Sequence, residues 1–231
     1  PNFIDKNTVT TINSKIESFI EKKSKDLNLG DVHRTDDGTV NTIHVMSQES
    51  NFFSDLLNSP EFTNLAKFII GETVQPQWAQ LFNKPKNTGM GAPFHQDNYY
   101  WNVIDNKTVT IWLALDEVNE TNGALSYYEN SHKKGLITHE ATFAKGTSQG
   151  VPKNILRQFH AESLVVPTLQ PGDILLHHGL TVHGSLPNNS NKNRRGMSFW
   201  YKSASAGYDE RLLYEYKKSL TNQKMKIYQN D

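Results

Sequence analysis

The sequence predicts a mainly β fold with flanking helices, in which an antiparallel β-sandwich or barrel is backed by helices. Apolar residues recur at helical spacing near the N-terminus, six short runs rich in aromatic and aliphatic residues follow, and turn residues separate these runs. At 231 residues the chain fits a single domain, with a helical part over about 1–75, a β core over about 76–205 and a C-terminal tail over 206–231.

The helical part contains two predicted helices. In residues 7–24, apolar side chains recur every three or four positions with Lys and Glu between them, which indicates an amphipathic surface helix. Residues 54–70 repeat this spacing, but Pro60 lies inside the segment and is expected to split it. Gly71 follows the last apolar position and is expected to end the helix.

The β core is predicted from runs that suit a pleated, half-buried surface, separated by turn pairs such as Asn122-Gly123 and Pro171-Gly172. Between two of these runs, residues 133–157 are polar with little periodicity and predict a long loop or lid. The six predicted strands cover residues 78–82, 108–115, 124–128, 164–169, 173–176 and 197–201.

Composition limits the classes of partner. Lys plus Arg equals Asp plus Glu at 24 each, so no net field attracts nucleic acid or anionic lipid, and a small-molecule substrate at a local site is expected. The chain has no cysteine, so any metal must bind His, Asp or Glu. The longest apolar run, residues 111–115, is too short to span a bilayer, and the first residues lack a signal-peptide pattern; a cytoplasmic location is expected.

The stretch PFHQDNYYW places His95 and Asp97 two residues apart among aromatic residues. Successive side chains on a strand alternate faces, so these two would point the same way and can bind one ion. The same spacing also fits a strand-edge histidine beside a solvated aspartate, so the pair alone does not identify a metal site.

A third ligand candidate lies in PGDILLHHGLTVHGS, where His183 follows a turn and a predicted strand. In a β-sandwich this segment can return to lie opposite an early strand, which would complete a set with His95 and Asp97. Two histidines and one carboxylate leave ligand positions open for substrate and dioxygen, as in non-haem Fe(II) oxygenases, although the same ligands also bind Zn(II).

A cation at the start of the last predicted strand gives a second clue. Arg194 there can bind a carboxylate through two hydrogen bonds, so a dicarboxylate could be held between metal and arginine. Arg194 and Arg195 also fit a solvated basic pair at a strand start.

Together these residues resemble the phytanoyl-CoA dioxygenase family of Fe(II)/2-oxoglutarate-dependent oxygenases. The resemblance is strong over about residues 78–201 and weak over the N-terminal third, and it implies a double-stranded β-helix (jelly-roll, cupin-like) core. The matching pieces are HQD at 95–97 with Tyr100-Trp101 after it, VTIWLALDEVNETNGAL at 109–125, NSHK at 130–133, PGDILLHHGLTVHGS at 171–185, and the Arg194 position.

The resemblance implies a role for each matching residue. His95, Asp97 and His183 would be the catalytic iron ligands, and Arg194 would pair with the distal carboxylate of 2-oxoglutarate, with Arg195 as the alternative if the turn is one residue longer. Further contacts to the cosubstrate are implied for Gln96, Trp112, Ser185, Gln80 and, from a weaker alignment, His44.

Several of these residues have a second interpretation. Trp112 fits a core position equally well, and Ser185 can bond its own backbone in a turn. Structural or supporting roles are expected for His177 and His178. The remaining histidines have no partner spacing and are expected at the surface or in loops; they are His33, His132, His139 and His160.

The implied reaction is hydroxylation of an aliphatic C–H bond in a small organic substrate by dioxygen, with release of succinate and CO2 from 2-oxoglutarate. Retention of Asp97 favours hydroxylation, because halogenating relatives replace this carboxylate with a small residue. Asn98, Tyr99, Tyr100 and Trp101 would line the substrate mouth, and such a wall suits an apolar chain or a quaternary ammonium group. Family substrates range over acyl-CoA, small amines, phosphonates and natural products, so the substrate stays open.

Two other functions remain possible on the residues alone. A divalent-metal hydrolase could use the same triad, but it would leave Arg194 and Trp112 without a purpose. A ligand-binding β-sandwich without catalytic activity could keep the motif residues for packing. Iron-dependent conversion of 2-oxoglutarate to succinate separates both from an oxygenase.

Overall fold

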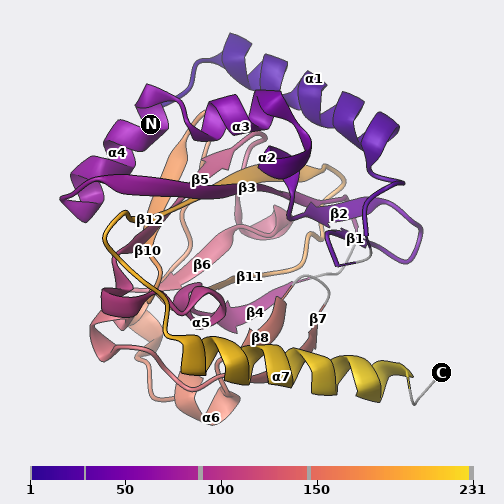
Figure 1. Ribbon diagram of the computed structural model, residues 1–231. Coiled ribbons are helices and arrows are strands. Elements are labelled where there is room, and N and C mark those ends of the chain that lie inside the picture. Colours follow the sequence, from indigo (N-terminus) through magenta and orange to yellow (C-terminus); the bar gives the residue numbers. More distant parts are fainter. Residues whose placement is uncertain (1, 29, 88–90, 145–146, 229–231) are drawn as a thin grey trace.

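The computed structural model describes residues 2–28, 30–87, 91–144 and 147–228 (Figure 1). Two antiparallel sheets form the centre, as the jelly-roll expectation requires, and helices cover the outer face of the larger one. The larger sheet has the order β1-β2-β3-β12-β5-β10, the second has the order β4-β11-β6-β9, and β7 pairs with β8 alone. A mainly β fold with flanking helices is therefore confirmed.

The strands of the larger sheet are β1 (Val32–Arg34), β2 (Val40–Ile43), β3 (Val74–Lys84), β12 (Arg194–Ser203), β5 (Thr108–Ala114) and β10 (Ile174–His178). The second sheet contains β4 (Ala92–His95), β11 (His183–Ser185), β6 (Leu125–Tyr128) and β9 (Leu164–Val165). The short ribbon contains β7 (Glu140–Ala144) and β8 (Thr147–Gly150).

The N-terminal helix α1 (Lys6–Lys23) matches the predicted amphipathic helix. Asp5 caps it by accepting hydrogen bonds from the backbone N–H groups of Asn7 and Thr8. Its apolar side faces inward, where Ile12 and Ile16 are fully buried in the main core against the larger sheet. The regular spacing of apolar residues was therefore a sufficient signal.

The second predicted helix is broken, as Pro60 required. Helix α3 (Asn51–Leu57) ends before it, and α4 (Pro60–Ile70) begins with the proline in its first turn, where a missing N–H costs nothing. Gly71 ends α4 in the left-handed conformation at φ 82°. The ring of Phe62 lies 4.4 Å from that of Phe199 on β12, which joins α4 to the sheet. The remaining short helices are α2 (Met46–Glu49), α5 (Asn98–Trp101), α6 (Lys153–Leu156) and the 3-10 turns η1 (Ile104–Asn106), η2 (Glu120–Asn122), η3 (Ser131–Lys134) and η4 (Ala161–Ser163).

Strand pairing places distant motifs side by side. β12 lies between β3 and β5, so Arg194 pairs with Lys84, and Ser198 lies between Gln80 and Trp112. In the second sheet β11 pairs with β4, and His183 lies directly opposite His95. The histidines of two motifs far apart in sequence are thus cross-strand neighbours.

Two segments contain more regular structure than the sequence predicted. Residues 133–157 are not a bare loop, because they contain the β7–β8 ribbon and the short helix α6. The two strands of the ribbon carry too few apolar residues to be predicted from the sequence. The expected tail over 206–231 contains the long helix α7 (Glu210–Tyr228), which crosses the lower side of the molecule in Figure 1. The strand expected at 164–169 is reduced to the two residues of β9.

None of the helices that the structure describes is both long enough and apolar enough to cross a membrane.

Candidate metal centre

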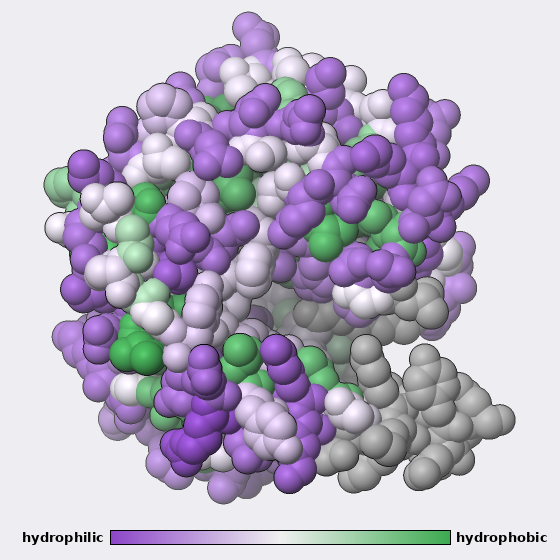
Figure 2. Space-filling view, viewed as in Figure 1, coloured by the Kyte–Doolittle hydropathy of each residue, from purple (hydrophilic) through white to green (hydrophobic). Residues whose placement is uncertain are grey.

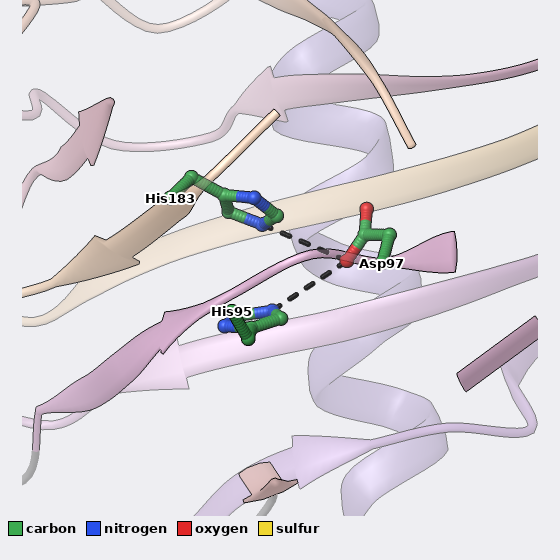
Figure 3. Close-up of side chains that lie close together, drawn as sticks. All are labelled: His95, Asp97 and His183. Carbon is green, nitrogen blue, oxygen red and sulfur yellow. Dashed lines mark ion pairs between the residues drawn. The ribbon is translucent and has the colours of Figure 1, made fainter. Parts of the chain in front are cut away.

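The side chains of His95, Asp97 and His183 converge on one point (Figure 3). The Nε2 atoms of His95 and His183 lie 3.5 Å and 3.6 Å from Asp97 Oδ1. One potential ligand atom from each of the three lies within 4.8 Å of the other two, so the set can hold one metal ion. The predicted triad is therefore brought together by the fold.

Hydrogen bonds fix which nitrogen of each histidine faces this point. The Nδ1 atoms of His95 and His183 lie 2.8 Å and 2.9 Å from the carbonyl oxygens of Pro93 and Thr181. A carbonyl accepts only, so each Nδ1 carries a proton, and each Nε2 is the nitrogen that faces the ligand position. Burial lowers the pKa of His183 to about 3, with the neighbouring His177 acting in the same direction, so this imidazole is neutral at pH 7.

The two oxygens of Asp97 have different partners. Oδ2 accepts hydrogen bonds from Thr110 Oγ1 at 2.8 Å and His177 Nε2 at 3.0 Å, while Oδ1 faces the two histidines. Burial by itself would raise the pKa of Asp97, but the electrostatic influence of His183 and the contacts with His177 and His95 outweigh it and hold the pKa well below its usual value. The carboxylate is ionised, oriented from behind, and has one oxygen directed at the metal position.

The structure corrects the geometry that was expected of the HxD stretch. β4 ends at His95, and Asp97 has helical dihedrals at the N-terminus of α5. The two side chains therefore converge through a turn and not by lying on one face of a strand. The short α5 begins there because the backbone N–H of Asn98 donates to Gly179 and the chain leaves the sheet.

A cavity of about 700 Å³ opens beside the triad between the two sheets. One end, the basic end, is lined by Lys84, Ser185 and Arg194; the other, the aromatic end, is lined by Tyr100, Trp101, Tyr216 and Leu220. The surface is hollowed near the centre of the view in Figure 2, above α7, which is the element that carries Tyr216 and Leu220.

At the basic end, Arg194 is buried with hydrogen-bonding capacity left over. Its Nη2 donates to the carbonyl of Gly123 at 2.8 Å, but Nε and Nη1 have no partner. Burial lowers its pKa to about 10, which still leaves it charged at pH 7. The guanidinium lies 5.4 Å from the ring of Trp112, within cation–π range. A buried guanidinium with free N–H groups is suited to a carboxylate.

The other cation of the pair points elsewhere. Arg195 binds Asp116 through Nε at 2.9 Å and Nη2 at 2.9 Å, and its Nη1 lies 3.1 Å from Glu17. Alternate residues of β12 face opposite sides of the sheet, so only Arg194 lines the cavity. Arg195, the alternative to Arg194 that the sequence left open, therefore does not line the cavity.

Of the other expected cosubstrate contacts, Trp112, Ser185, Gln80 and His44 line the cavity. Burial lowers the pKa of His44 to about 4, so this histidine is neutral at pH 7. Lys84 also lines the basic end, although the sequence did not single it out; burial first, and then Arg194, lowers its pKa to about 6.

The expectation for Gln96 was wrong. Its amide Nε2 donates to the carbonyls of Gly135 and Leu180 at 2.9 Å and 2.7 Å, and its Oε1 accepts from the N–H of Ile137. The side chain is fully buried and is not among the described residues that line the cavity. Gln96 ties the HxD turn to two loops, because the turn after β4 directs its side chain away from the ligands.

Two of the four expected mouth residues are also misplaced. Tyr100 and Trp101 line the cavity, but Asn98 is buried and bonds Val103 and the side chain of Asn106, which makes it a structural residue. Tyr99 is not among the described lining residues and stacks on another ring at 4.1 Å, that of His139. The helical turn of α5 sends these neighbours in different directions, whereas a strand would have alternated them.

His139 was expected at the surface or in a loop; it lies in the loop before β7 but is buried. Its Nε2 accepts the backbone N–H of Gln96 at 2.9 Å, and burial lowers its pKa to about 4. His177 positions Asp97, whereas His178 Nδ1 accepts from the N–H of Leu180 and does not contact the triad. His33 packs edge-on against His44, with 5.2 Å between ring centroids. Sequence spacing gave no signal for these tertiary contacts.

Comparisons with known proteins agree with this geometry. The family model described as "Phytanoyl-CoA dioxygenase (PhyH)" matches residues 1–196. A probable alpha-ketoglutarate-dependent hypophosphite dioxygenase of Stutzerimonas stutzeri is 30% identical over 157 residues, covering 65% of this chain and 53% of that protein. The peroxisomal phytanoyl-CoA dioxygenase of Bos taurus is 25% identical over 219 residues, covering 90% and 65%. The chain thus spans about half to two thirds of the length of these relatives.

Among solved structures, EctD from S. alaskensis with 2-oxoglutarate and 5-hydroxyectoine superposes with a TM-score of 0.73 at 20% identity, covering 89% of this chain and 71% of that one. At this identity the likeness shows the fold, and the fold is the jelly roll of 2-oxoglutarate oxygenases.

Proposed function

The chain belongs to the phytanoyl-CoA dioxygenase (PhyH) family, and from this premise we propose that it is an Fe(II)- and 2-oxoglutarate-dependent oxygenase. Its proposed reaction is hydroxylation of an aliphatic C–H bond in a small organic substrate, with release of succinate and CO2. One observation carries the proposal: a two-histidine, one-carboxylate set lies in the same cavity as a buried arginine with unpaired N–H groups.

The donor set fits Fe(II). Two imidazole nitrogens and one carboxylate form the facial arrangement that leaves positions open for other ligands. In this proposal His95, Asp97 and His183 hold the ion, while Thr110 and His177 hold the second oxygen of Asp97 in place. Iron bound there would supply the redox chemistry that couples decarboxylation of 2-oxoglutarate to oxidation of the substrate.

The residues of the basic end fit a dicarboxylate cosubstrate. The free Nε and Nη1 of Arg194 can donate to a carboxylate that would otherwise lack a partner, and the buried surroundings strengthen that bond. Trp112 packs on the guanidinium and limits where it can move. Ser185, on the strand that carries His183, is placed to add a hydroxyl.

The same residues argue against the two alternatives. A hydrolase that used the triad would not require a buried arginine with unpaired N–H groups in its cavity. A binding protein without catalysis would not need one carboxylate oxygen of Asp97 free of other hydrogen bonds and directed at both histidines.

A spectroscopic titration tests the proposal. Metal-free protein receives Fe(II) and then 2-oxoglutarate under anaerobic conditions, and the weak visible charge-transfer band of the chelated cosubstrate is recorded. The band should appear in wild type, and Arg194→Leu should raise the 2-oxoglutarate concentration needed for it by about a hundredfold, because a buried charge-assisted bond is lost.

Arg195→Leu is the matched control and should titrate like wild type, since Arg195 faces Asp116 on the other side of the sheet. Asp97→Ala should give no band and no succinate. Iron binding without a band in wild type would reject the oxygenase function, and succinate release by Asp97→Ala would reject the ligand assignment.

A further inference from the structure

Helix α7 closes one side of the cavity although it lies beyond the part of the chain that matches the family model. That match ends at residue 196, and α7 begins at Glu210. The helix is fixed at its start, where the N–H of Asp209 donates to the carbonyl of Asn102 at 2.7 Å and the Asp209 side chain accepts from Arg211 and Leu212. Its first turn is therefore anchored to the end of α5, next to the metal ligands.

The middle of α7 packs on the residues beside the triad. The ring of Tyr216 lies 5.5 Å from that of Tyr100 at 83°, and the ring of Tyr100 lies 5.7 Å from that of His95. A single aromatic ring thus separates the helix from a metal ligand. A hydrogen bond joins Tyr216 to Ser148 on β8.

A second tie connects α7 with β8 one turn further on. Gln149 Nε2 donates to Ser219 Oγ at 3.0 Å, and the carbonyl of Gln149 accepts the hydroxyl of Tyr100 at 2.7 Å. Helix, ribbon and α5 therefore form one wall that turns Tyr216 and Leu220 to the cavity.

This wall has a definite chemistry. Among the described residues that line the cavity, the formally charged side chains are Asp97, Lys84 and Arg194, which lie at the triad and the basic end. The α7 side offers aromatic rings and a leucine, beside the uncharged polar side chains of Thr147 and Ser148 on β8. An anionic substrate group would lose its water there without gaining an opposite charge, whereas an apolar ring would gain contact area and a quaternary ammonium group would be attracted to the aromatic faces.

Resting on the proposed function, we propose that α7 is the specificity element of this enzyme and that Tyr216 and Leu220 select an organic substrate with an apolar ring and no anionic group at this end of the cavity. The cavity volume of about 700 Å³ fits this class. Pockets of roughly 300–1,000 Å³ take drug-sized ligands, and the proposed 2-oxoglutarate takes up only the basic end of this cavity, so the rest leaves room for a substrate that contains a ring.

Calorimetric titration with three naphthalene probes tests this inference. The probes share one ring and differ in charge: 2-naphthalenemethanol, its trimethylammonium analogue and naphthalene-2-sulfonate. Each is titrated into protein holding Fe(II) and excess 2-oxoglutarate without oxygen. The neutral probe should bind at least about tenfold more tightly than the sulfonate, because burying an unpaired anion is costly, whereas the trimethylammonium probe should stay within about tenfold of the neutral one because the aromatic faces attract it.

Variants of α7 then locate the binding surface. Tyr216→Ala should weaken the neutral probe by about tenfold and Leu220→Ala by about threefold, in proportion to the apolar surface removed. Tyr216→Phe keeps the ring and should stay within about twofold of wild type. Tyr214→Ala is the matched control, because Tyr214 lies on the same helix and is 63% exposed.

Two results would overturn the inference: unchanged binding in both Tyr216→Ala and Leu220→Ala, or tightest binding of the sulfonate. Thermal unfolding of each variant checks that it folds. If wild type forms no 2-oxoglutarate band, the proposed function fails separately, and the same titrations on metal-free protein still decide whether α7 binds the ring.

Discussion

The two ends of the cavity are built in opposite ways. The basic end is made by residues of long paired strands, with Arg194 on β12 opposite Lys84 on β3, both buried. The aromatic end is made by the single turn of α5, the β7–β8 ribbon and α7, which are held together by side-chain contacts. Strand pairing fixes the first end to the core, while packing of separate elements forms the second. In the proposed function the cosubstrate would lie at the end fixed by strand pairing, and the substrate at the end formed by packing.

This difference predicts that the basic end tolerates little change in side-chain volume. Gly196→Ala is the substitution expected to disturb it most. A Cβ at this position would lie 2.0 Å from the ring of Trp112, which packs against Arg194. The ring must move, so the free energy of unfolding should fall by about 3 kcal/mol, as for overpacked cores, and the 2-oxoglutarate requirement should rise.

Gly207→Ala is the matched control, because a Cβ there meets only Ile104 Cδ1 at an ordinary 3.8 Å. Urea unfolding and the anaerobic titration measure both effects. Wild-type behaviour of Gly196→Ala would mean that the ring has room the structure does not show.

At the aromatic end, acid should act through His139, which supports α5 by stacking on Tyr99. Burial lowers its pKa to about 4 from the ordinary value of 6.5. Between these values the unfolded chain binds a proton that the folded chain excludes, so this histidine reduces stability as the pH falls from 6.5 towards 4 and has no effect above 6.5. The loss between about pH 7 and about pH 5 should be about 2 kcal/mol.

His139→Gln tests this, because glutamine can still accept the N–H of Gln96 but does not titrate. Urea unfolding of metal-free wild type and variant at both pH values gives the difference. The variant should lose less stability than wild type on acidification; an equal loss would assign the acid sensitivity to other groups.

Between the two ends, Thr110→Val should produce the smallest effect. The change removes one of the two hydrogen bonds on Asp97 Oδ2 and leaves His177 in place. Loss of such a supporting bond typically lowers metal affinity by about tenfold, and Fe(II) competition with a chelator measures it. Thr108→Val on the same strand is the control, since the Thr108 hydroxyl has no hydrogen-bond partner. If both variants bound Fe(II) with equal affinity, His177 alone would orient Asp97 and the role of Thr110 would be rejected.

Sequence patterns predicted the elements whose signal is local. The apolar spacing of α1, the break at Pro60 and the end of α4 at Gly71 follow from single-chain rules of helix formation. Strands β5 and β12 carry continuous runs of buried residues and were also found. The short strands β1, β2, β4 and β11 have three or four residues each and acquire strand geometry only from their partners.

The sequence by itself determined which residue types are available for the chemistry: histidines and a carboxylate in ordered motifs, an arginine pair at a strand start, and no cysteine. Only the tertiary structure decided that Arg194 and not Arg195 lines the cavity, that Gln96 and Asn98 face away from it, and that α7 reaches it. The direction of a side chain depends on strand register and on the turn in which it lies, and contacts between distant segments depend on packing. The spacing of residues along the chain predicts neither the direction of a side chain nor the contacts between distant segments.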